Sequence, residues 1–287
     1  MFSLHLIYMI LSGLAFACLD LVRKMLAGRL EPLALVFFMS LGAVPLTGTL
    51  VAVYGAGRPT VGYLVPGLGA LVLSFAGSLG FIHSVKISPL SRTIPLLSLT
   101  PVFTAVMAVP LLGERPSGRQ ALGIALVVIG AMALNSDGNL VRPLVGLVRE
   151  KGALIMTGVA LLWSISGPLD KKAIDQASVY FHASVMTIGV ALGALGILAV
   201  QRQISSLETG RRHIVLLGAS MIAVTLALTF QLLAIQHVLV SLVEAMKRAL
   251  GSLTALVLGR LVFGETIHPV QVAAVVVMVA GVFFVLA

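Results

Sequence analysis

The chain alternates between long apolar runs and short polar breaks along almost its whole length. Ten of these runs reach the roughly 20 residues that a helix needs to cross a bilayer. Lipid offers no hydrogen-bond partners to the backbone, so we expect every run to form a helix. The predicted helices span residues 4–22, 32–54, 61–84, 89–112, 117–135, 152–169, 178–201, 213–235, 238–262 and 268–287. The pattern therefore predicts an all-α integral membrane protein that crosses the bilayer many times.

The composition excludes a soluble protein. The mean hydropathy is +1.11, with 59% hydrophobic and 10% charged residues, which is outside the range of soluble globular domains. The formal net charge of +9 comes from 19 Lys and Arg residues spread over short loops. That distribution is typical of membrane insertion and of contact with anionic lipids. No basic face interleaved with aromatic residues is present, so we exclude nucleic acid as a partner and expect the lipid bilayer.

Motifs for covalent or metal chemistry are few. Cys18 is the only cysteine, so no disulfide can form within the chain. Ala15-Phe16-Ala17, just before Cys18, resembles the cleavage site of a signal peptide, but no Lys or Arg precedes the apolar run. We therefore expect an uncleaved first helix. No phosphate-binding loop, zinc signature or HExxH motif occurs, so we expect no cofactor, no metal site and no ATP-driven pump.

The second half of the chain repeats the first. A shift of 151 residues superposes two copies of the pattern G-E-x5-Q-x9-G, and each copy closes one helix and opens the next. The matched residues are Gly113, Glu114, Gln120 and Gly130 in the first copy, and Gly264, Glu265, Gln271 and Gly281 in the second. A weaker match at a shift of 148 superposes Arg23-Lys24 on Lys171-Lys172. We expect each glutamate to favour the positive end of the helix that follows it.

The repeat divides the chain into two five-helix units. The longest polar connection separates a first repeat at residues 1–136 from a second at 152–287, with a linker at 137–151. Because each unit has an odd number of helices, the second must enter the membrane from the opposite side. The fold class is therefore two inverted five-helix repeats, an architecture in which transporters bind substrate between the halves near the midplane.

Short motifs in both halves carry a family resemblance. They are Pro89-Leu90-Ser91, Leu99-Thr100-Pro101-Val102-Phe103, Leu111-Leu112-Gly113-Glu114-Arg115-Pro116, Trp163-Ser164, Lys247-Arg248 and Leu261-Val262-Phe263-Gly264-Glu265. With these motifs the sequence resembles the drug/metabolite transporter superfamily, in its ten-helix EamA-type branch. The resemblance implies a secondary transporter with a central cavity, and it leaves the substrate open among amino acids, sugars, nucleotides, drugs and other small metabolites.

One departure narrows the substrate. The small multidrug exporters of that superfamily carry a glutamate eight residues before a lysine on the first helix. Here Phe16 precedes Lys24 at that spacing, and Ser164 precedes Lys172. The missing carboxylate disfavours an exporter of lipophilic cations.

The ninth span holds the strongest candidates for substrate binding. Glu244, Lys247 and Arg248 lie inside an otherwise apolar helix, and Arg248 is about 15 Å from its start. Charges at that depth are expected to face water or a partner. Glu244 and Arg248 are four residues apart with the acid first, which favours pairing. Glu244 can neutralise one of the two cations, which leaves one for an anionic group. An internal salt bridge is the alternative. Farther along the same face, small residues are expected to pack closely against another helix: Gly251, Ala255 and Gly259.

Other spans supply further candidates. Ser91 and Arg92 in the fourth span are assigned to the substrate site, with prolines expected to kink that helix and free its carbonyls. Arg92 at an interface is the alternative. Trp163 in the sixth span is expected to wall the cavity or, alternatively, to pack against a helix.

Two acid–base pairs at helix ends admit two interpretations. Asp20 with Lys24, and Asp170 with Lys171 and Lys172, are expected to form interfacial ion pairs. The functional alternative is gating or binding of a coupling ion by Asp20, Lys24, Asp170 and Lys172.

Together these features favour a multi-pass secondary transporter in a cell (inner) membrane, as a monomer or homodimer. It would move a small polar metabolite, such as an amino acid or a sugar, by alternating access. A membrane-embedded lipid-carrier flippase or enzyme is the alternative, but the histidines are dispersed and no acidic cluster accompanies them, so we expect no enzyme. The loops on the side of the termini carry five basic residues and those on the other side carry ten, so the positive-inside rule favours termini outside the cell. The resemblance implies termini inside, and both orientations stay open.

Overall fold

The computed structural model describes residues 4–27, 29–88, 90–135, 150–203, 213–263 and 268–286. Over these ranges the chain is helical and contains no strand. The helices are α1 (Leu4–Ala27), α2 (Pro32–Tyr54), the 3₁₀ turn η1 (Val61–Tyr63), α3 (Leu64–Ile87), α4 (Leu90–Leu97), α5 (Thr100–Leu112), α6 (Gly118–Asn135), α8 (Lys151–Ile174), α9 (Val179–Val200), α10 (Ile214–Ile235), α11 (Val240–Phe263) and α12 (Pro269–Leu286). The predicted all-α fold is confirmed, with the fourth span divided between α4 and α5.

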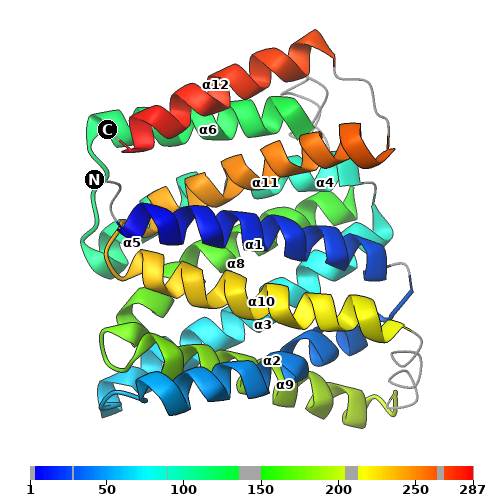
Figure 1. The fold of residues 1–287 in the computed structure, drawn as a ribbon, viewed down its shortest axis with the longest axis vertical. Coiled ribbons are helices and arrows are strands. Elements are labelled where there is room, and N and C mark those ends of the chain that lie inside the picture. The colour runs from blue at the N-terminus through cyan, green and yellow to red at the C-terminus, as the bar shows by residue number, and fades with distance from the viewer. Residues whose placement is uncertain are drawn as a thin grey trace.

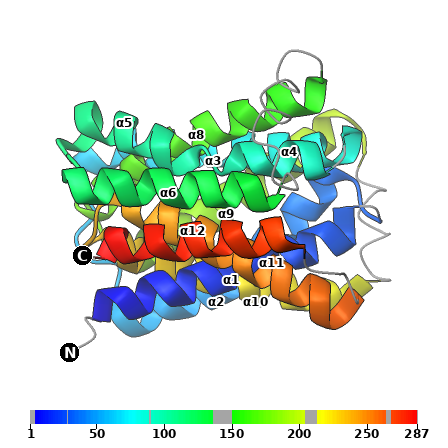
Figure 2. The same cartoon turned by 90° about the horizontal axis from the view of Figure 1, so that it is seen from above.

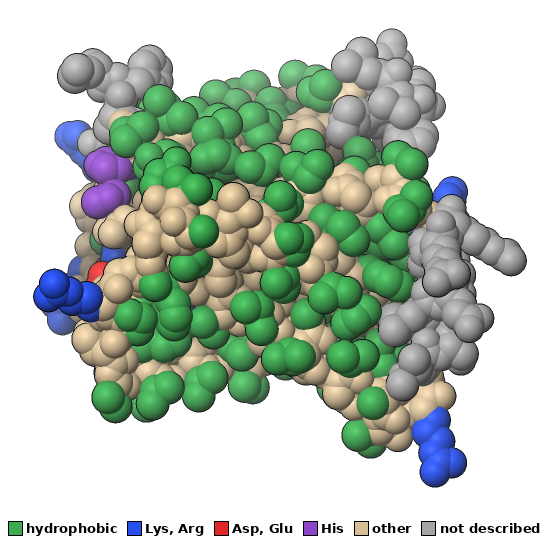
Figure 3. Space-filling view, turned by 60° about the horizontal axis from the view of Figure 1, so that its bottom comes forward, with side chains coloured by type: hydrophobic (Ala, Val, Ile, Leu, Met, Phe, Trp, Pro, Cys, Tyr) green, Lys and Arg blue, Asp and Glu red, His purple; other side chains and the backbone are tan. Residues whose placement is uncertain are grey.

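The helices suit a bilayer. Within the described ranges, eight segments are long and apolar enough to cross a membrane, and α6 is a shorter apolar helix. The remaining helix, α11, has the length but carries the charged residues of the ninth span. Figure 3 shows one face covered with hydrophobic side chains, while Lys and Arg gather at its two ends. An apolar belt between charged ends matches the hydrocarbon core and the two interfaces.

The helices form two layers (Figures 1 and 2). One layer contains α1, α2, α10, α11 and α12, and the other contains α3, α4 with α5, α6, α8 and α9. Each layer therefore mixes helices from both halves of the chain. We call the end of the bundle at which α1 begins and α12 ends the terminal end, and the other the opposite end.

The packing obeys a twofold symmetry that exchanges the halves. Contacts of α1 with α10 and α11 are matched by contacts of α8 with α3 and α5, and the α2–α10 contact is matched by α9–α3. Two further contacts, α2 with α9 and α6 with α12, join a helix to its own symmetry mate. These pairings are those of two inverted five-helix repeats, as the sequence predicts.

The repeated motif has a structural explanation. Gly113 ends α5 in the left-handed conformation, with φ at 71°. The side chain of Gln120 accepts a hydrogen bond from the backbone N–H of Ser117 at 2.9 Å, which caps the start of α6. Gly281 lies at the crossing of α6 and α12, where an added Cβ would lie 2.6 Å from the backbone nitrogen of Val127. The pattern therefore encodes a helix end, a helix start and a close helix crossing, while Gly264 and Glu265 lie outside the described residues.

The fourth span is broken rather than kinked. Tight turns replace helical bonds at the break, where the N–H of Ser98 donates to the carbonyl of Pro95 at 3.1 Å. The hydroxyl of Thr100 donates to the carbonyl of Leu97 at 2.7 Å. Pro95 and Pro101 remove two backbone donors, so a side-chain hydroxyl satisfies one of the carbonyls left free.

Candidate functional site

A cavity of about 500 Å³ lies between the two layers, and both layers line it. At its deep end it is lined by Asp170, Gln231 and Glu244, each four residues from a helix boundary at the terminal end. Near the opposite end it is lined by Arg23 and Val85, four and two residues from the ends of α1 and α3. The cavity thus begins about one helical turn from the terminal end and extends to the opposite end.

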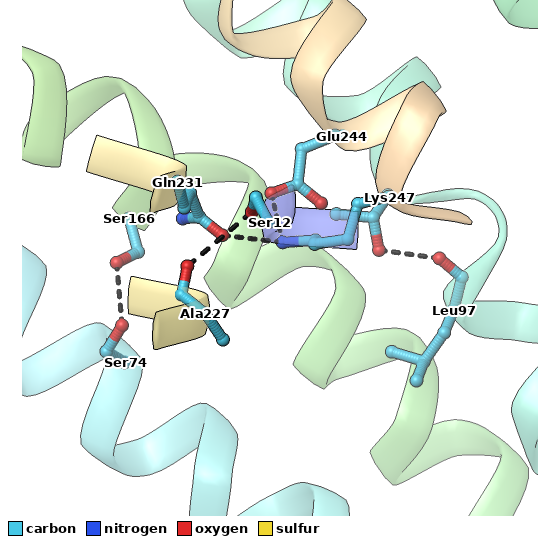
Figure 4. A network of polar contacts seen from close by, with 9 residues as sticks. Ser12, Ser74, Leu97, Ser166, Ala227, Gln231, Glu244 and Lys247 are labelled. Carbon is cyan, nitrogen blue, oxygen red and sulfur yellow. Dashed lines mark hydrogen bonds and ion pairs between the residues drawn. The ribbon is translucent and has the colours of Figure 1, made fainter. Parts of the chain in front are cut away.

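The ninth span contributes a buried ion pair to this cavity. The ammonium of Lys247 donates to Glu244 Oε1 at 2.5 Å and to Gln231 Oε1 at 2.9 Å (Figure 4). Glu244 is 3% exposed and Lys247 is 9% exposed. The predicted partner of Glu244 was Arg248, and this prediction is wrong. Lys247, three residues along α11, takes that position because its flexible stem reaches both oxygens.

Two arginines share the cavity without being fully satisfied. Arg23 Nη1 lies 3.3 Å from Asp20 Oδ1. The Nε atoms of Arg23 and Arg248 are buried, and neither has a hydrogen-bond partner in the part of the chain that the structure describes. The positive charges of these two residues are close enough to act on one another. Unpaired guanidinium donors beside a cavity are suited to a carboxylate or another anionic group.

Aromatic rings form the wall beside these charges. The ammonium of Lys247 lies 4.4 Å from the ring centroid of Phe16, and the guanidinium of Arg23 lies 5.8 Å from that of Phe81. Trp163 stacks on Phe81 with 5.9 Å between centroids. Gly77 leaves room for the indole, since an added Cβ there would collide with it. Trp163 both lines the cavity and packs against α3. Phe16 and Phe81 hold the two cations by cation–π contacts.

The rest of the lining is partly polar and partly apolar. The hydroxyls of Ser74 and Ser166 lie 3.0 Å apart across α3 and α8 (Figure 4). Met39, Val224 and Leu228 supply apolar surface from α2 and α10. The cavity can therefore hold a solute that combines a charged or polar group with an apolar body.

The small residues of α11 serve a different purpose from the one predicted. Gly251 and Ala255 line the cavity, and an added Cβ at Gly251 would meet no atom within 4 Å. The prediction that this face packs closely against another helix is therefore wrong at these two positions, and the surroundings of Gly259 lie outside the described part of the structure. Small side chains here keep open the part of the cavity beyond Arg248.

Asp170 is not an interfacial residue. It is 3% exposed, and its Oδ1 lies 3.0 Å from Nε2 of the fully buried His182. Nδ1 of His182 lies 2.8 Å from the hydroxyl of Tyr63, which is 5% exposed. The predicted ion pair of Asp170 with Lys171 and Lys172 is therefore wrong, because α8 turns Asp170 toward α9 and the cavity instead.

Lys171 joins the two layers at the terminal end. Its ammonium donates to Glu114 Oε1 at 2.6 Å and to the carbonyl of Val238 at 2.9 Å. Glu114 Oε2 accepts from the backbone N–H of Val240 at 2.9 Å. Glu114 therefore stabilises the start of α11 rather than that of the following helix, α6. We call these four residues the terminal bridge.

The other predicted site residues are less informative. Asp20 lines the cavity and pairs with Arg23. The side chains of Lys24, Ser91 and Arg92 lie outside the described part of the chain. Lys172 is exposed and does not line the cavity.

The sequence interpretation missed several residues that line the cavity or connect to it: Phe16, Arg23, Phe81, Tyr63 and His182. Arg23 was named only in the weaker repeat match, although its position one turn before the end of α1 matches a cavity mouth. His182 lies 119 residues from Tyr63 in sequence, and no local pattern links two residues at that distance.

Comparison with known proteins agrees with this architecture. The sequence profile of the EamA-like transporter family matches residues 3–136 and 150–287, with one copy in each half. One solved crystal structure is similar to the chain with a TM-score of 0.76 at 16% sequence identity. That similarity covers 98% of this chain and 96% of the other, and at this identity it shows the fold alone. No curated protein matches the chain. The family match confirms the resemblance drawn from the sequence.

Proposed function

Since the chain belongs to the EamA-like transporter family, and is thus a membrane transporter of the drug/metabolite superfamily, we propose that it moves a small polar metabolite by alternating access. The observation that carries this proposal is the cavity between the layers with Lys247, Glu244 and Arg248 in its wall. Its volume of about 500 Å³ falls in the range of small-molecule sites and suits an amino acid or a sugar.

The charges favour a substrate with an anionic group. Glu244 neutralises Lys247, and Asp20 lies beside Arg23. Of the three cations that line the cavity, Arg248 is therefore the one that has no carboxylate within ion-pair distance among the described residues. Aromatic rings beside this group favour a substrate with an apolar or planar body. An amino acid combines these features, and it is the first substrate class to test.

The arrangement of the layers supports alternating access. The cavity extends to the opposite end, while the terminal bridge and the ring pair of Tyr54 with Tyr180 lie at the terminal end. We infer that the second state opens the terminal bridge and closes the opposite end. Because each layer mixes the two repeats, the moving bodies are the layers rather than the two halves of the sequence.

The test is reconstitution of the purified protein into liposomes with a panel of labelled amino acids, sugars and organic acids. Uptake of at least one solute is expected, and it should be lost in Arg248→Ala while protein yield and thermal unfolding stay as in the wild type. Leu154→Ala provides a control, because this side chain is exposed on the apolar surface. If no solute of the panel moves, the transport proposal fails; if transport persists in Arg248→Ala, the site assignment fails.

We place the protein in the cell (inner) membrane, where its helix lengths and basic loops suit insertion. The same liposomes test a flippase with fluorescent lipids, and product analysis of the incubated solutes tests an enzyme. Lipid movement or product formation without solute flux would replace the transporter by one of these alternatives.

A further inference from the structure

Tyr63, His182 and Asp170 form a buried hydrogen-bonded triad that has no role in the site described so far. Three titratable side chains from η1, α9 and α8 meet there with donor–acceptor distances of 2.8 and 3.0 Å. All three are buried, with exposures of 5%, 0% and 3%. Buried polar groups of this kind are expensive to keep unless each one is bonded, and at depth in a membrane they mark ion pathways.

The position of this triad connects the cavity to the terminal end. Asp170 belongs to the deep end of the cavity lining. Tyr63 closes η1 next to the loop at the terminal end, where Thr60 bonds to Gln176. His182 bridges the two with both ring nitrogens in use. Asp170 at one end of the triad therefore meets the cavity, and Tyr63 at the other end lies beneath the surface that the second state of the cycle must open.

Its hydrogen bonds can rearrange to hold one proton more. With Asp170 ionised and His182 neutral, Nε2 donates to the carboxylate and Nδ1 accepts from the Tyr63 hydroxyl. When a proton is added to His182, Nδ1 becomes a donor and the Tyr63 oxygen becomes the acceptor, which requires only a rotation of the hydroxyl. When the proton is added to Asp170 instead, the acid donates to Nε2 and Nδ1–H donates to Tyr63. Both hydrogen bonds survive in every state.

The surroundings link this proton to the substrate cations. The charges of Lys247 and Glu244 on α11 act on Asp170. On α8 itself, Lys171 is held by Glu114 of the α5–α6 loop, and Lys172 is exposed. The sequences of α5 and α10 contain no titratable side chain. Neutralising Asp170 therefore leaves the Lys247–Glu244 pair, and Arg248 beside it, in a more positive field.

We propose that Tyr63, His182 and Asp170 form the binding site of a coupling proton, so that this transporter is driven by a proton gradient. The proposal rests on the transport function proposed above. The proton comes from water in the cavity, binds within the triad, and returns to water on the other side after the layers rearrange. Only O–H and N–H bonds form and break. Binding of the proton makes the field around Arg248 more positive, so an anionic or zwitterionic solute binds with it and travels in the same direction.

The proton site is tested without any substrate. Infrared difference spectra between acid and alkaline pH are recorded for the protein in lipid nanodiscs. The carboxylic-acid region is expected to contain a component from Asp170 that is present in the wild type and absent in Asp170→Asn, over the background of the other carboxyl groups. The matched control is Asp175→Asn, five residues farther along the sequence and just past the end of α8, where the side chain is exposed. Persistence of that component in Asp170→Asn, or its loss in Asp175→Asn, overturns the site.

Coupling is tested in liposomes with a mixture of the labelled amino acids and an imposed pH gradient. The wild type should accumulate label, and a protonophore should abolish that accumulation. Asp170→Asn should let label equilibrate without accumulation. Tyr63→Phe keeps the ring that packs against Phe181 and should shift the pH dependence of uptake, which a purely structural role would not do.

The two proposals fail in different ways. Wild-type uptake that ignores both the pH gradient and the protonophore overturns the coupling and leaves the transporter intact. Absence of uptake for every solute overturns the transporter, and the infrared arm then still decides the proton site. If Asp170→Asn does not fold, His182→Gln replaces it: label should again equilibrate without accumulation, and the infrared component of Asp170 should shift in frequency, because the acid keeps its carboxyl group but loses its partner.

Discussion

At the scale of single residues, the cavity contains charges that differ in how well they are satisfied. Lys247 is bound by Glu244 and Gln231, while the Nε atom of Arg248 has no partner among the described residues. Removing one member of a buried ion pair leaves the other charge uncompensated, whereas removing an unpaired group breaks no bond. The two neighbouring cations should therefore respond differently to mutation.

We expect Lys247→Ala to lose about 3–5 kcal/mol of stability, because Glu244 is left buried and unpaired. The double variant Glu244→Gln/Lys247→Met should recover most of that loss, yet it should not transport. Arg248→Ala should keep wild-type stability. Thermal unfolding in detergent measures all three. Equal destabilisation by Lys247→Ala and Arg248→Ala would contradict this assignment of the ion pair.

Gly251 offers a second residue-scale test. Gly251→Leu should retain or raise stability, because glycine is about 0.8–1.0 kcal/mol worse than alanine or leucine in a helix and an added Cβ meets open space here. The longer side chain fills the cavity, so solute uptake should fall sharply. Gly218→Leu on α10 is the matched control, since its added Cβ also meets no atom and the residue does not line the cavity. Uptake at the wild-type rate in Gly251→Leu would mean that substrate does not pass this point.

At the scale of elements, the crossing of α6 with α12 depends on small residues. An added Cβ at Gly123 would lie 2.7 Å from the backbone nitrogen of Val285, and one at Gly130 would lie 2.8 Å from the carbonyl oxygen of Ala274. Backbone atoms cannot move aside as a flexible side chain can. This contact is therefore intolerant of any added methyl group.

Gly281→Ala should destabilise the protein by about 1–3 kcal/mol through overpacking against the backbone of α6. Gly196→Ala on α9 should be neutral or stabilising by up to about 1 kcal/mol, because that position is exposed and helical. Unfolding temperatures in one detergent compare the two. A neutral Gly281→Ala would show that the two helices can separate without loss.

The elements were largely predictable from the sequence, whereas the site was only partly so. Helix boundaries follow from apolar runs that end at Gly, Pro and polar residues, and these are local signals. The charged residues of α11 were identifiable because Lys247 and Arg248 conflict with an apolar surrounding. The pairing of Asp170 with His182 was not, because it depends on which faces of α8 and α9 meet. Gly251 was misread because small residues suit both close packing and an open cavity.

At the scale of the whole molecule, the two layers meet closely at the terminal end and enclose a cavity that reaches the opposite end. The terminal bridge holds α8 and the α5–α6 loop against the start of α11. The described part of the chain is thus closed at the terminal end, and we expect solute to enter from the opposite end. Cys18 is exposed on the outer surface of α1 and does not line the cavity.

In a Cys18→Ala background, Gly251→Cys should react with a membrane-impermeant maleimide added on the side opposite to the termini. Reagent added on the side of the termini should react far more slowly. Adding Lys171→Met, which breaks the terminal bridge, should speed the second reaction. The unsubstituted protein is the control, because Cys18 faces lipid. Equal labelling from both sides before that change would contradict a closed terminal end.

The halves should also associate as separate chains. We expect residues 1–136 and 150–287, coexpressed as two polypeptides, to copurify and bind the same solute, because α6–α12 and α2–α9 hold them together. Affinity purification through a tag on one half measures this. Gly281→Ala in the second half should weaken recovery of the first.

The contacts α2–α9 and α6–α12 have a consequence for ancestry. Each joins an element to its own counterpart, which is the property of an isologous interface in a symmetric dimer. A single five-helix polypeptide, inserted into the membrane in both orientations, would assemble through these same surfaces. Fusion of two such genes would then have freed the copies to diverge. The fourth helix of one copy would have kept a lysine and an arginine, and the fourth helix of the other would have been broken by prolines.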